Sequence, residues 1–290
     1  MNTNKTILRA LSIFSIAALL FACADAPKKE VVTEQEEEKI VEVPVETTKS
    51  EESIADFILP SPIQIAAIFN RAGLVYEGGL ANPVSNVSNY NTKTAKYLNF
   101  GVYSADLAYA VLNSQQQASI DYINVVRTIS DEIGMPSIFG SGALLKSFEK
   151  NIDNQDSILK ILTTIKSRTD DYLTESGDES KEAIFFSAAW VEGMYLGAKS
   201  AKNTAEITPR IIEQMTILQN IINAVKMQKD PSIDLKFLVE GLQNIKKTFE
   251  GFEETQDLEN KDIDSIHLTV EEIMALNESI SALRTKIING

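Results

Sequence analysis

The chain is predicted to be all-α, and three observations of the sequence lead to this prediction. Apolar residues recur every three or four positions along most of the chain after residue 60, which is the period of an amphipathic helix. No convincing strand pattern, with alternating apolar and polar residues, appears in residues 54–290. Capping residues, glycines and prolines divide the apolar stretches into segments of helical length. We therefore expect a multi-helix bundle or array of about nine helices.

The first 22 residues are expected to be a cleaved signal peptide that takes no part in the fold. Lys5 and Arg9 make the start basic, and an uncharged run of 13 residues follows from Ala10 to Ala22. This run is shorter than the roughly 20 residues that a membrane-spanning helix needs. A basic start followed by a short apolar run is typical of an export signal.

The apolar run ends in Leu20-Phe21-Ala22-Cys23, which places an aliphatic and a small residue before the only cysteine of the chain. This sequence resembles the lipobox of bacterial lipoprotein signal peptides. The resemblance implies that Cys23 becomes the mature N-terminus and carries acyl chains, such as palmitate, on its sulfur and amine. Stable anchoring takes about two lipid signals, which several acyl chains on one residue supply. The alternative is an ordinary secretory signal in which Cys23 is incidental.

The residue after the cysteine bears on the membrane that holds the protein. In the lipoprotein family an aspartate directly after the cysteine often signals retention in the inner membrane. Here that position is Ala24, and Asp25 stands one position further on. The resemblance therefore implies an outer-membrane lipoprotein of the cell envelope, and it leaves open whether the protein faces the periplasm or the cell surface.

Residues 23–53 are expected to form a disordered acidic tether. Residues 24–53 contain ten acidic side chains and four lysines. Such a segment buries too little apolar surface to offset the entropy lost on ordering, and its charges repel one another. The tether is expected to act as a spacer, with an acidic tail for a basic partner as the alternative.

Residues 54–290 are expected to form one all-helical domain. Ser61 and Pro62 are typical of the start of a helix, and Gly73 is expected to close it. A connection rich in turn residues follows. Apolar stretches then predict helices at residues 92–113, 115–133, 141–151, 155–175, 180–202, 205–228, 232–250 and 269–288.

Local signals support several of these boundaries. Gly134 and Gly177 stand just after predicted helix ends, where glycine is favoured. Asp230-Pro231 separates two predicted helices, and Thr269 with Glu272 fits a capping box.

Two long apolar segments each contain a single charged residue. Asp106 is the only charge in residues 97–120, and Glu192 is the only charge in residues 183–198. Helices that are apolar nearly all round are buried, so both carboxylates are expected inside the domain. Small residues in both segments, such as Gly101 and Gly193, indicate close approach by another helix or a ligand.

A buried carboxylate must be paired, hydrogen-bonded or protonated, because leaving it uncompensated costs too much free energy. One interpretation is structural, with the partners being tyrosine hydroxyls or arginines such as Arg71, Arg127, Arg168 and Arg210. The other is that the two acids converge on a ligand pocket. The residues of this candidate pocket are Asp106, Glu192, Tyr103, Tyr109, Trp190 and Tyr195.

Aromatic residues with a polar group are concentrated in the first part of the domain. All eight tyrosines and the only tryptophan lie between residues 76 and 195. Such residues are favoured in binding surfaces, and they also fill core positions.

Composition argues against several classes of function. A net charge of −14 disfavours nucleic-acid binding. One cysteine and one histidine, His267, disfavour metal sites built from those residues, and no metal or cofactor is expected. A catalytic triad would have to use His267, which lies in a charged segment.

The sequence thus favours a non-enzymatic, lipid-anchored envelope protein. Its helical domain is expected to bind a small ligand or an envelope protein partner. One alternative is an envelope hydrolase in which Asp106 and Glu192 act as acid and base, provided that they lie in an open cleft. The other is a purely structural spacer.

Overall fold

The computed structural model describes residues 59, 61–199, 204–256, 258 and 261–290. Ten α-helices and three short 3-10 helices form within these residues, and no strand does, which confirms the predicted all-α class. No helix in the same residues is long and apolar enough to cross a bilayer. The predicted signal peptide, Cys23 and the tether lie outside the described residues.

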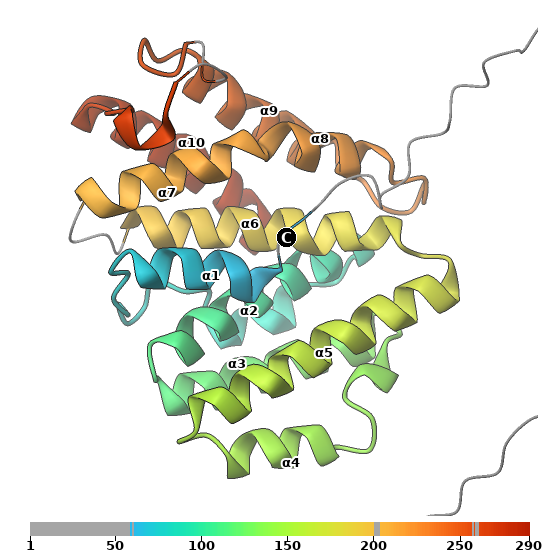
Figure 1. Ribbon diagram of the computed structural model, residues 1–290. Helices are drawn as coiled ribbons and strands as arrows, with labels where there is room; N and C mark the ends of the chain where they lie inside the picture. Colours follow the sequence, from blue (N-terminus) through green and yellow to red (C-terminus); the bar gives the residue numbers. More distant parts are fainter. Residues whose placement is uncertain (1–58, 60, 200–203, 257, 259–260) are drawn as a thin grey trace, which may run out of the picture. The chain divides into compact units, whose positions relative to one another are not determined.

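Three helices lie at the centre of the domain. These are α1 (Pro62–Arg71), α2 (Lys93–Leu112) and α6 (Ser180–Lys199). α2 packs against α6 along much of its length, and α1 packs on both (Figure 1). As predicted, α2 and α6 are buried on nearly all sides, whereas the other long helices bury only one face.

Two groups of helices cover the central three on opposite sides (Figure 1). One group consists of α3 (Gln116–Glu132), α4 (Ala143–Lys150) and α5 (Gln155–Ser176). The other consists of α7 (Thr204–Thr216), α8 (Leu218–Lys226), α9 (Lys236–Glu250) and α10 (Val270–Asn289). α10 contacts α9, α6 and α2, and it thereby joins its group to the centre.

The predicted helix boundaries agree with the caps in the structure. Ser61 and Gln64 form a capping box at α1, and Thr269 and Glu272 form one at α10. Gly177 ends α5 in the left-handed conformation, at a φ of 68°. The 3-10 helices η2 (Val84–Asn89), η3 (Pro136–Ile138) and η5 (Ile263–Ser265) lie in segments for which no helix was predicted.

The prediction of one helix over residues 205–228 is wrong. The chain forms α7 and α8, which are separated at Ile217, and Pro209 lies inside α7. The apolar stripe continues across the break, with Ile212, Met215 and Leu218 all buried. The helical spacing of apolar residues therefore continues through the break, and no glycine or proline stands at Ile217 to indicate it.

The helix predicted over residues 232–250 is shorter than expected. α9 begins at Lys236 and not near residue 232, because the turn that starts at Asp230 uses the intervening residues; the Asp230 carboxylate accepts hydrogen bonds from Ser232. α6 is described as far as Lys199, and the end of its predicted range, residues 200–202, lies outside the described residues.

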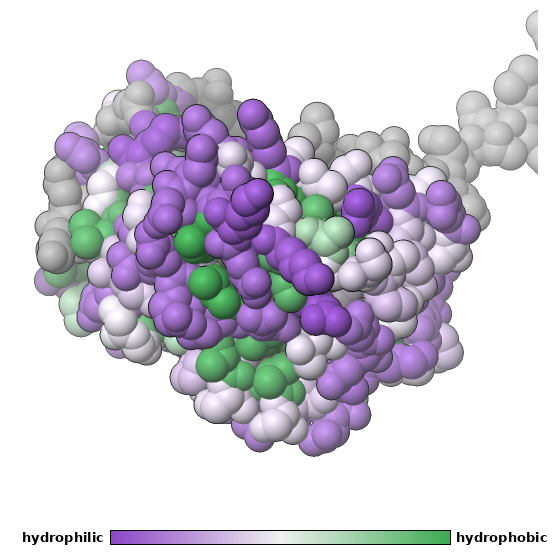
Figure 2. Space-filling view, turned by 90° about the horizontal axis from the view of Figure 1, so that it is seen from below, coloured by the Kyte–Doolittle hydropathy of each residue, from purple (hydrophilic) through white to green (hydrophobic). Residues whose placement is uncertain are grey.

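The side of the domain at the foot of Figure 1 is mostly hydrophilic, with small separate hydrophobic patches (Figure 2).

Candidate functional site

The small residues of α2 and α6 allow helices to approach closely. A Cβ atom on Gly101 would overlap the backbone carbonyl of Phe185, so α2 and α6 touch backbone to backbone at this point. A Cβ on Gly193 would lie 2.7 Å from Ile65, and one on Gly197 would lie 2.7 Å from the Phe69 ring. Neighbouring helices, and no ligand, therefore account for these glycines.

The structure brings Asp106 and Glu192 together. Both side chains are fully buried, and they lie close enough for Glu192 to raise the pKa of the Asp106 carboxyl. Glu192 accepts two hydrogen bonds from Arg284 of α10, from Nε at 2.7 Å and from Nη2 at 2.8 Å. Oδ2 of Asp106 accepts a hydrogen bond from the backbone amide of Asn82 at 3.2 Å. We call Asp106, Glu192 and Arg284 the buried cluster.

Electrostatics indicate which carboxyl group of the buried cluster keeps a proton. Burial raises the pKa of Asp106 well above its ordinary value, and the neighbouring Glu192 raises it further, against the opposing effect of Arg284. Oδ1 of Asp106 receives no hydrogen bond from a donor group in the described residues. With Asp106 protonated, the cluster carries one positive and one negative charge and is neutral as a whole.

Tyr103 and Tyr109, the two tyrosines of the candidate pocket that lie on α2, bind backbone groups. Oη of Tyr103 donates to the carbonyl of Pro83 at 2.8 Å, and Oη of Tyr109 donates to that of Val75 at 2.9 Å. Tyr109 also accepts from the amide of Glu77 at 2.7 Å. One face of α2 thus holds the connection between α1 and α2 at several points.

The other two aromatic residues of the candidate pocket lie on α6. Trp190 is fully buried, and its Nε1 has no hydrogen-bond partner among the described residues. The Tyr195 ring lies under the guanidinium of Arg284, whose Cζ is 4.0 Å from the ring centroid. All eight tyrosines are buried or pack against the core, so packing and hydrogen bonding account for their concentration in this part of the chain.

The sequence did not reveal Arg284 as the partner of the carboxylates. The arginines considered instead bind elsewhere or lie at the surface: Arg168 donates to the carbonyl of Ile138, and Arg210 pairs with Glu213. One available signal was the phase of Arg284 in α10, where it lies four residues after Ile280 and eight after Leu276, both buried. A charged residue in the apolar phase of a helix indicates a buried partner.

Asn82 and Asn99 were also missed. Both are fully buried. The side chain of Asn99 donates to the carbonyl of Ile287 at 3.0 Å. The side chain of Asn82 donates to the hydroxyl of Tyr90, and the backbone amide of Asn82 donates to Asp106. Together with Arg284, which donates to the carbonyl of Leu80 at 3.2 Å, they attach the end of α10 to α2 and to the connection that precedes it.

No known protein family matches the chain, and no curated protein or solved structure was found to be similar to it. A function must therefore be argued from the residues of this chain. Within the described residues, no group of three or more histidine, cysteine, aspartate or glutamate side chains is arranged to hold a metal ion. His267 is exposed in the segment before α10.

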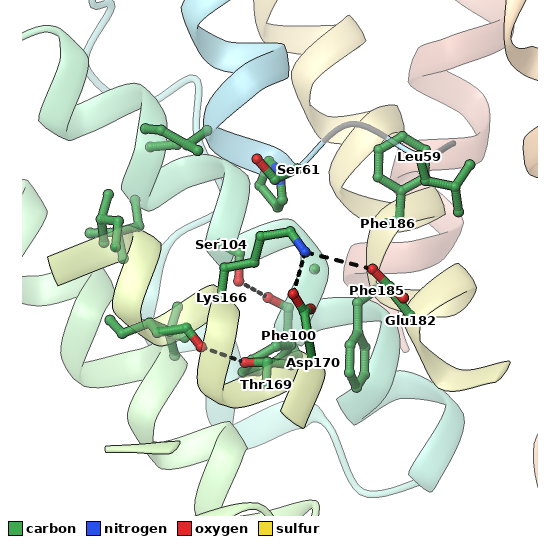
Figure 3. Close-up of a pocket in the computed structure, with 18 residues that line it drawn as sticks. Leu59, Ser61, Phe100, Ser104, Lys166, Thr169, Asp170, Glu182, Phe185 and Phe186 are labelled. Carbon is green, nitrogen blue, oxygen red and sulfur yellow. Dashed lines mark hydrogen bonds and ion pairs between the residues drawn. The ribbon is translucent and has the colours of Figure 1, made fainter. Parts of the chain in front are cut away.

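A cavity of about 110 Å³ lies between α5 and the central helices α1, α2 and α6. Its walls are mainly apolar and include Leu107, Leu162 and Ile165. Phe100, Phe185 and Phe186 also line it (Figure 3). α5 makes only small contacts with α2 and α6, which leaves this space between them. Asp106 and Glu192 line neither this cavity nor two others, one beside α7 and one beside the start of α3.

Two hydroxyl groups that line this cavity, those of Ser104 and Thr169, bond to their own helices. Oγ of Ser104 donates to the carbonyl of Phe100 at 2.6 Å, and Oγ1 of Thr169 donates to that of Ile165 at 2.9 Å. These hydroxyl groups have already used their donor, so the interior favours an apolar occupant.

Three charged residues lie at the mouth of the cavity, and we call them the rim cluster. Nζ of Lys166 is 2.6 Å from Oδ2 of Asp170 on the same helix and 3.8 Å from Oε1 of Glu182 on α6 (Figure 3). Each of the three side chains is about 40% exposed. Partial burial raises the pKa of Glu182, against the opposing effect of Lys166, and Asp170 raises it further.

Proposed function

We propose that this chain is a lipid-anchored binding protein of the bacterial cell envelope, and that it takes a small apolar group into the cavity between α5 and the central helices. The observation that carries the proposal is this cavity, whose walls are apolar and whose mouth is charged. Cavities that bind small molecules are usually concave, mainly apolar, and provided with a few polar groups that orient the ligand.

The anchor rests on the sequence. Cys23 is the only cysteine and occupies the position that lipidation requires in the lipobox Leu20-Phe21-Ala22-Cys23. The residue that follows, Ala24, supports the outer membrane as the destination.

The closed form of the buried cluster supports a structural role for Asp106 and Glu192. Neither side chain is exposed, and Arg284 occupies both oxygens of Glu192. A substrate could reach them only after α10 or the connection before α2 had moved, so the geometry does not favour their use as a catalytic acid and base.

Cell fractionation tests the anchor. We expect the native chain in the outer-membrane fraction and the Cys23→Ser chain outside the membrane fraction. Ala24→Asp is the matched change next to it, and it should keep the protein in membranes but move it toward the inner membrane. A Cys23→Ser chain that stays in membranes would contradict the anchor.

Ligand-detected NMR with n-pentanol, a small neutral probe, tests the cavity. The full chain with Cys23→Ser is used because it avoids detergent, which would compete for apolar sites. We expect saturation transfer to pentanol with this chain and its loss when Ser104→Leu fills the cavity. Ser176→Leu is the matched control, since Oγ of Ser176 also donates to its own helix but lies outside the cavity.

Circular dichroism would show whether Ser104→Leu folds. If it does not, Leu162→Phe fills the cavity from the opposite wall, on α5. Equal transfer to pentanol in the native, filled and control chains would show that the cavity is not the binding site.

A further inference from the structure

The rim cluster carries one more negative than positive charge. Among the residues that line the cavity, only Lys166, Asp170 and Glu182 are charged. Lys166 lies close to Asp170, at 2.6 Å, and further from Glu182, at 3.8 Å. Lys166 therefore interacts with two carboxylates, and its ion pair with Glu182 is the weaker of the two.

Glu182 stands where a ligand's head group would lie. It belongs to α6, the wall opposite Lys166, and its carboxylate faces the lysine across the mouth of the cavity (Figure 3). It is half-buried beside the apolar wall formed by Phe185 and Phe186. A carboxylate in such a setting gains more from an additional cation than a fully solvated one does.

The size of the cavity limits the apolar part of the ligand. A cavity of about 150 Å³ lined by apolar side chains holds a benzene molecule. The cavity here is about 110 Å³, so it suits a group slightly smaller than a benzene ring, such as a chain of about four carbon atoms, and the carbon next to the head group of a pentyl probe would lie at the mouth.

From these observations we infer that the ligand is an amphipathic molecule with a single positive charge. Its short aliphatic group lies inside the cavity, and its cationic head group lies at Glu182 and Asp170. This inference rests on the proposed function. A ligand with an anionic head would face two carboxylates and a lysine that is already paired. A ligand with a second charge at its far end would bury that charge among the phenylalanines, which is unfavourable without a partner.

A titration with three probes of equal chain length tests the inference. n-Pentylamine, n-pentanol and pentanoate are compared by ligand-detected NMR at neutral pH and low salt, with the full chain carrying Cys23→Ser. We expect pentylamine to bind about tenfold more tightly than pentanol, as a charge-assisted contact allows, and pentanoate to bind most weakly. 1,5-Diaminopentane should bind more weakly than pentylamine.

Glu182→Gln is the variant that isolates the head-group site. It should bring the affinity for pentylamine down to that for pentanol and leave pentanol binding unchanged. Glu240→Gln is the matched control, because Glu240 pairs with Lys236 at 3.9 Å on the exposed face of α9. It should keep the full preference for the amine. Asp170→Asn provides a second variant if Glu182→Gln does not fold.

The outcomes separate this inference from the proposed function. If pentanol binds as tightly as pentylamine, the cavity binds apolar groups but the inferred cation site is wrong. If no probe binds, the proposed function fails as well. A preference for the amine that survives in Glu182→Gln, or in the filled Ser104→Leu chain, would show attraction to the acidic surface in general and would overturn the inference.

Discussion

The buried cluster and the rim cluster contain the same kinds of group, two carboxyls and one base, yet they have opposite properties. Asp106, Glu192 and Arg284 are enclosed, with side-chain exposures of 0% for Glu192 and 9% for Arg284. The corresponding groups of the rim cluster are about 40% exposed. Burial therefore separates the two clusters: it raises the pKa of the enclosed Asp106 well above its ordinary value, whereas the carboxylates of the rim cluster stay open to solvent and to a ligand.

The basic residues differ in a way that fits these settings. Arg284 offers a planar fork that bonds both oxygens of Glu192 while its Nη2 also reaches the carbonyl of Leu80. Lys166 is a point charge that can move between two acceptors. The arginine suits a fixed structural contact, and the lysine suits a mouth at which a ligand's cation shares the same carboxylates.

Removal of the basic residue from each cluster should give the largest contrast. Arg284→Met leaves Glu192 buried without its partner, so we expect the free energy of unfolding to fall by about 3–5 kcal/mol. Lys166→Met is the matched change at the rim and should cost no more than about 1 kcal/mol. Urea unfolding followed by circular dichroism measures both. Equal losses in the two variants would contradict the distinction between the clusters.

A smaller effect is expected where α2 holds the connection before it. Tyr109→Phe removes the hydrogen bonds to Val75 and Glu77, and leaving those groups unpaired should cost about 1–2 kcal/mol. Tyr172→Phe is the control, because its hydroxyl donates to the carbonyl of Gly134 at an exposed position. Urea unfolding should show a clearly smaller loss for the control. Faster hydrogen exchange of the Glu77 amide in Tyr109→Phe would locate the effect.

The smallest change at neutral pH is expected for Asp106→Asn. An asparagine can accept from the Asn82 amide and donate to Glu192, as a protonated aspartic acid does, so we expect a change within about 1 kcal/mol or a gain in stability. Because burial and Glu192 raise the pKa of Asp106 above 3.8, its contribution is complete at low pH and declines as the pH rises through the raised pKa.

The native chain should therefore lose stability relative to Asp106→Asn as the pH rises from about 4 toward neutral. Asp106→Asn keeps Glu192, Arg284 and the Asn82 backbone amide, which act on the pKa of Asp106. It also keeps the neighbouring tyrosines whose own pKa values Asp106 raises, namely Tyr76, Tyr90, Tyr103 and Tyr122. Urea unfolding of both chains over this pH range isolates the effect of the one carboxyl. A constant difference, or a native chain that gains relative to the variant, would show that Asp106 is not protonated.

Much of the fold followed from the sequence because its signals are local. Ser61 with Pro62, Thr269 with Glu272, and Gly177 each act within one turn of their own helix, and each ends or begins a helix where predicted. The break at Ile217 could not be found in this way, since its flanking residues keep the apolar period.

The site was less accessible to sequence analysis because it depends on distant contacts. The lone charges of α2 and α6 indicated that Asp106 and Glu192 are buried, but the partner Arg284 lies 92 residues beyond Glu192. The walls of the cavity have the same apolar spacing as the core. Only the loose contact of α5 with α2 and α6 distinguishes the cavity walls from the core. This contact depends on how the helices pack, which the spacing of apolar residues does not show.

The most direct test of the account is to locate the bound probe on the protein. Backbone amide chemical shifts are followed by NMR while n-pentanol is added to the full chain with Cys23→Ser. We predict that the shifts concentrate on the cavity walls, near Phe100, Ile165 and Phe185, and leave the amides of Asp106, Glu192 and Arg284 unchanged. Shifts centred on the buried cluster, with the cavity walls unaffected, would contradict the assignment of binding to one site and structure to the other.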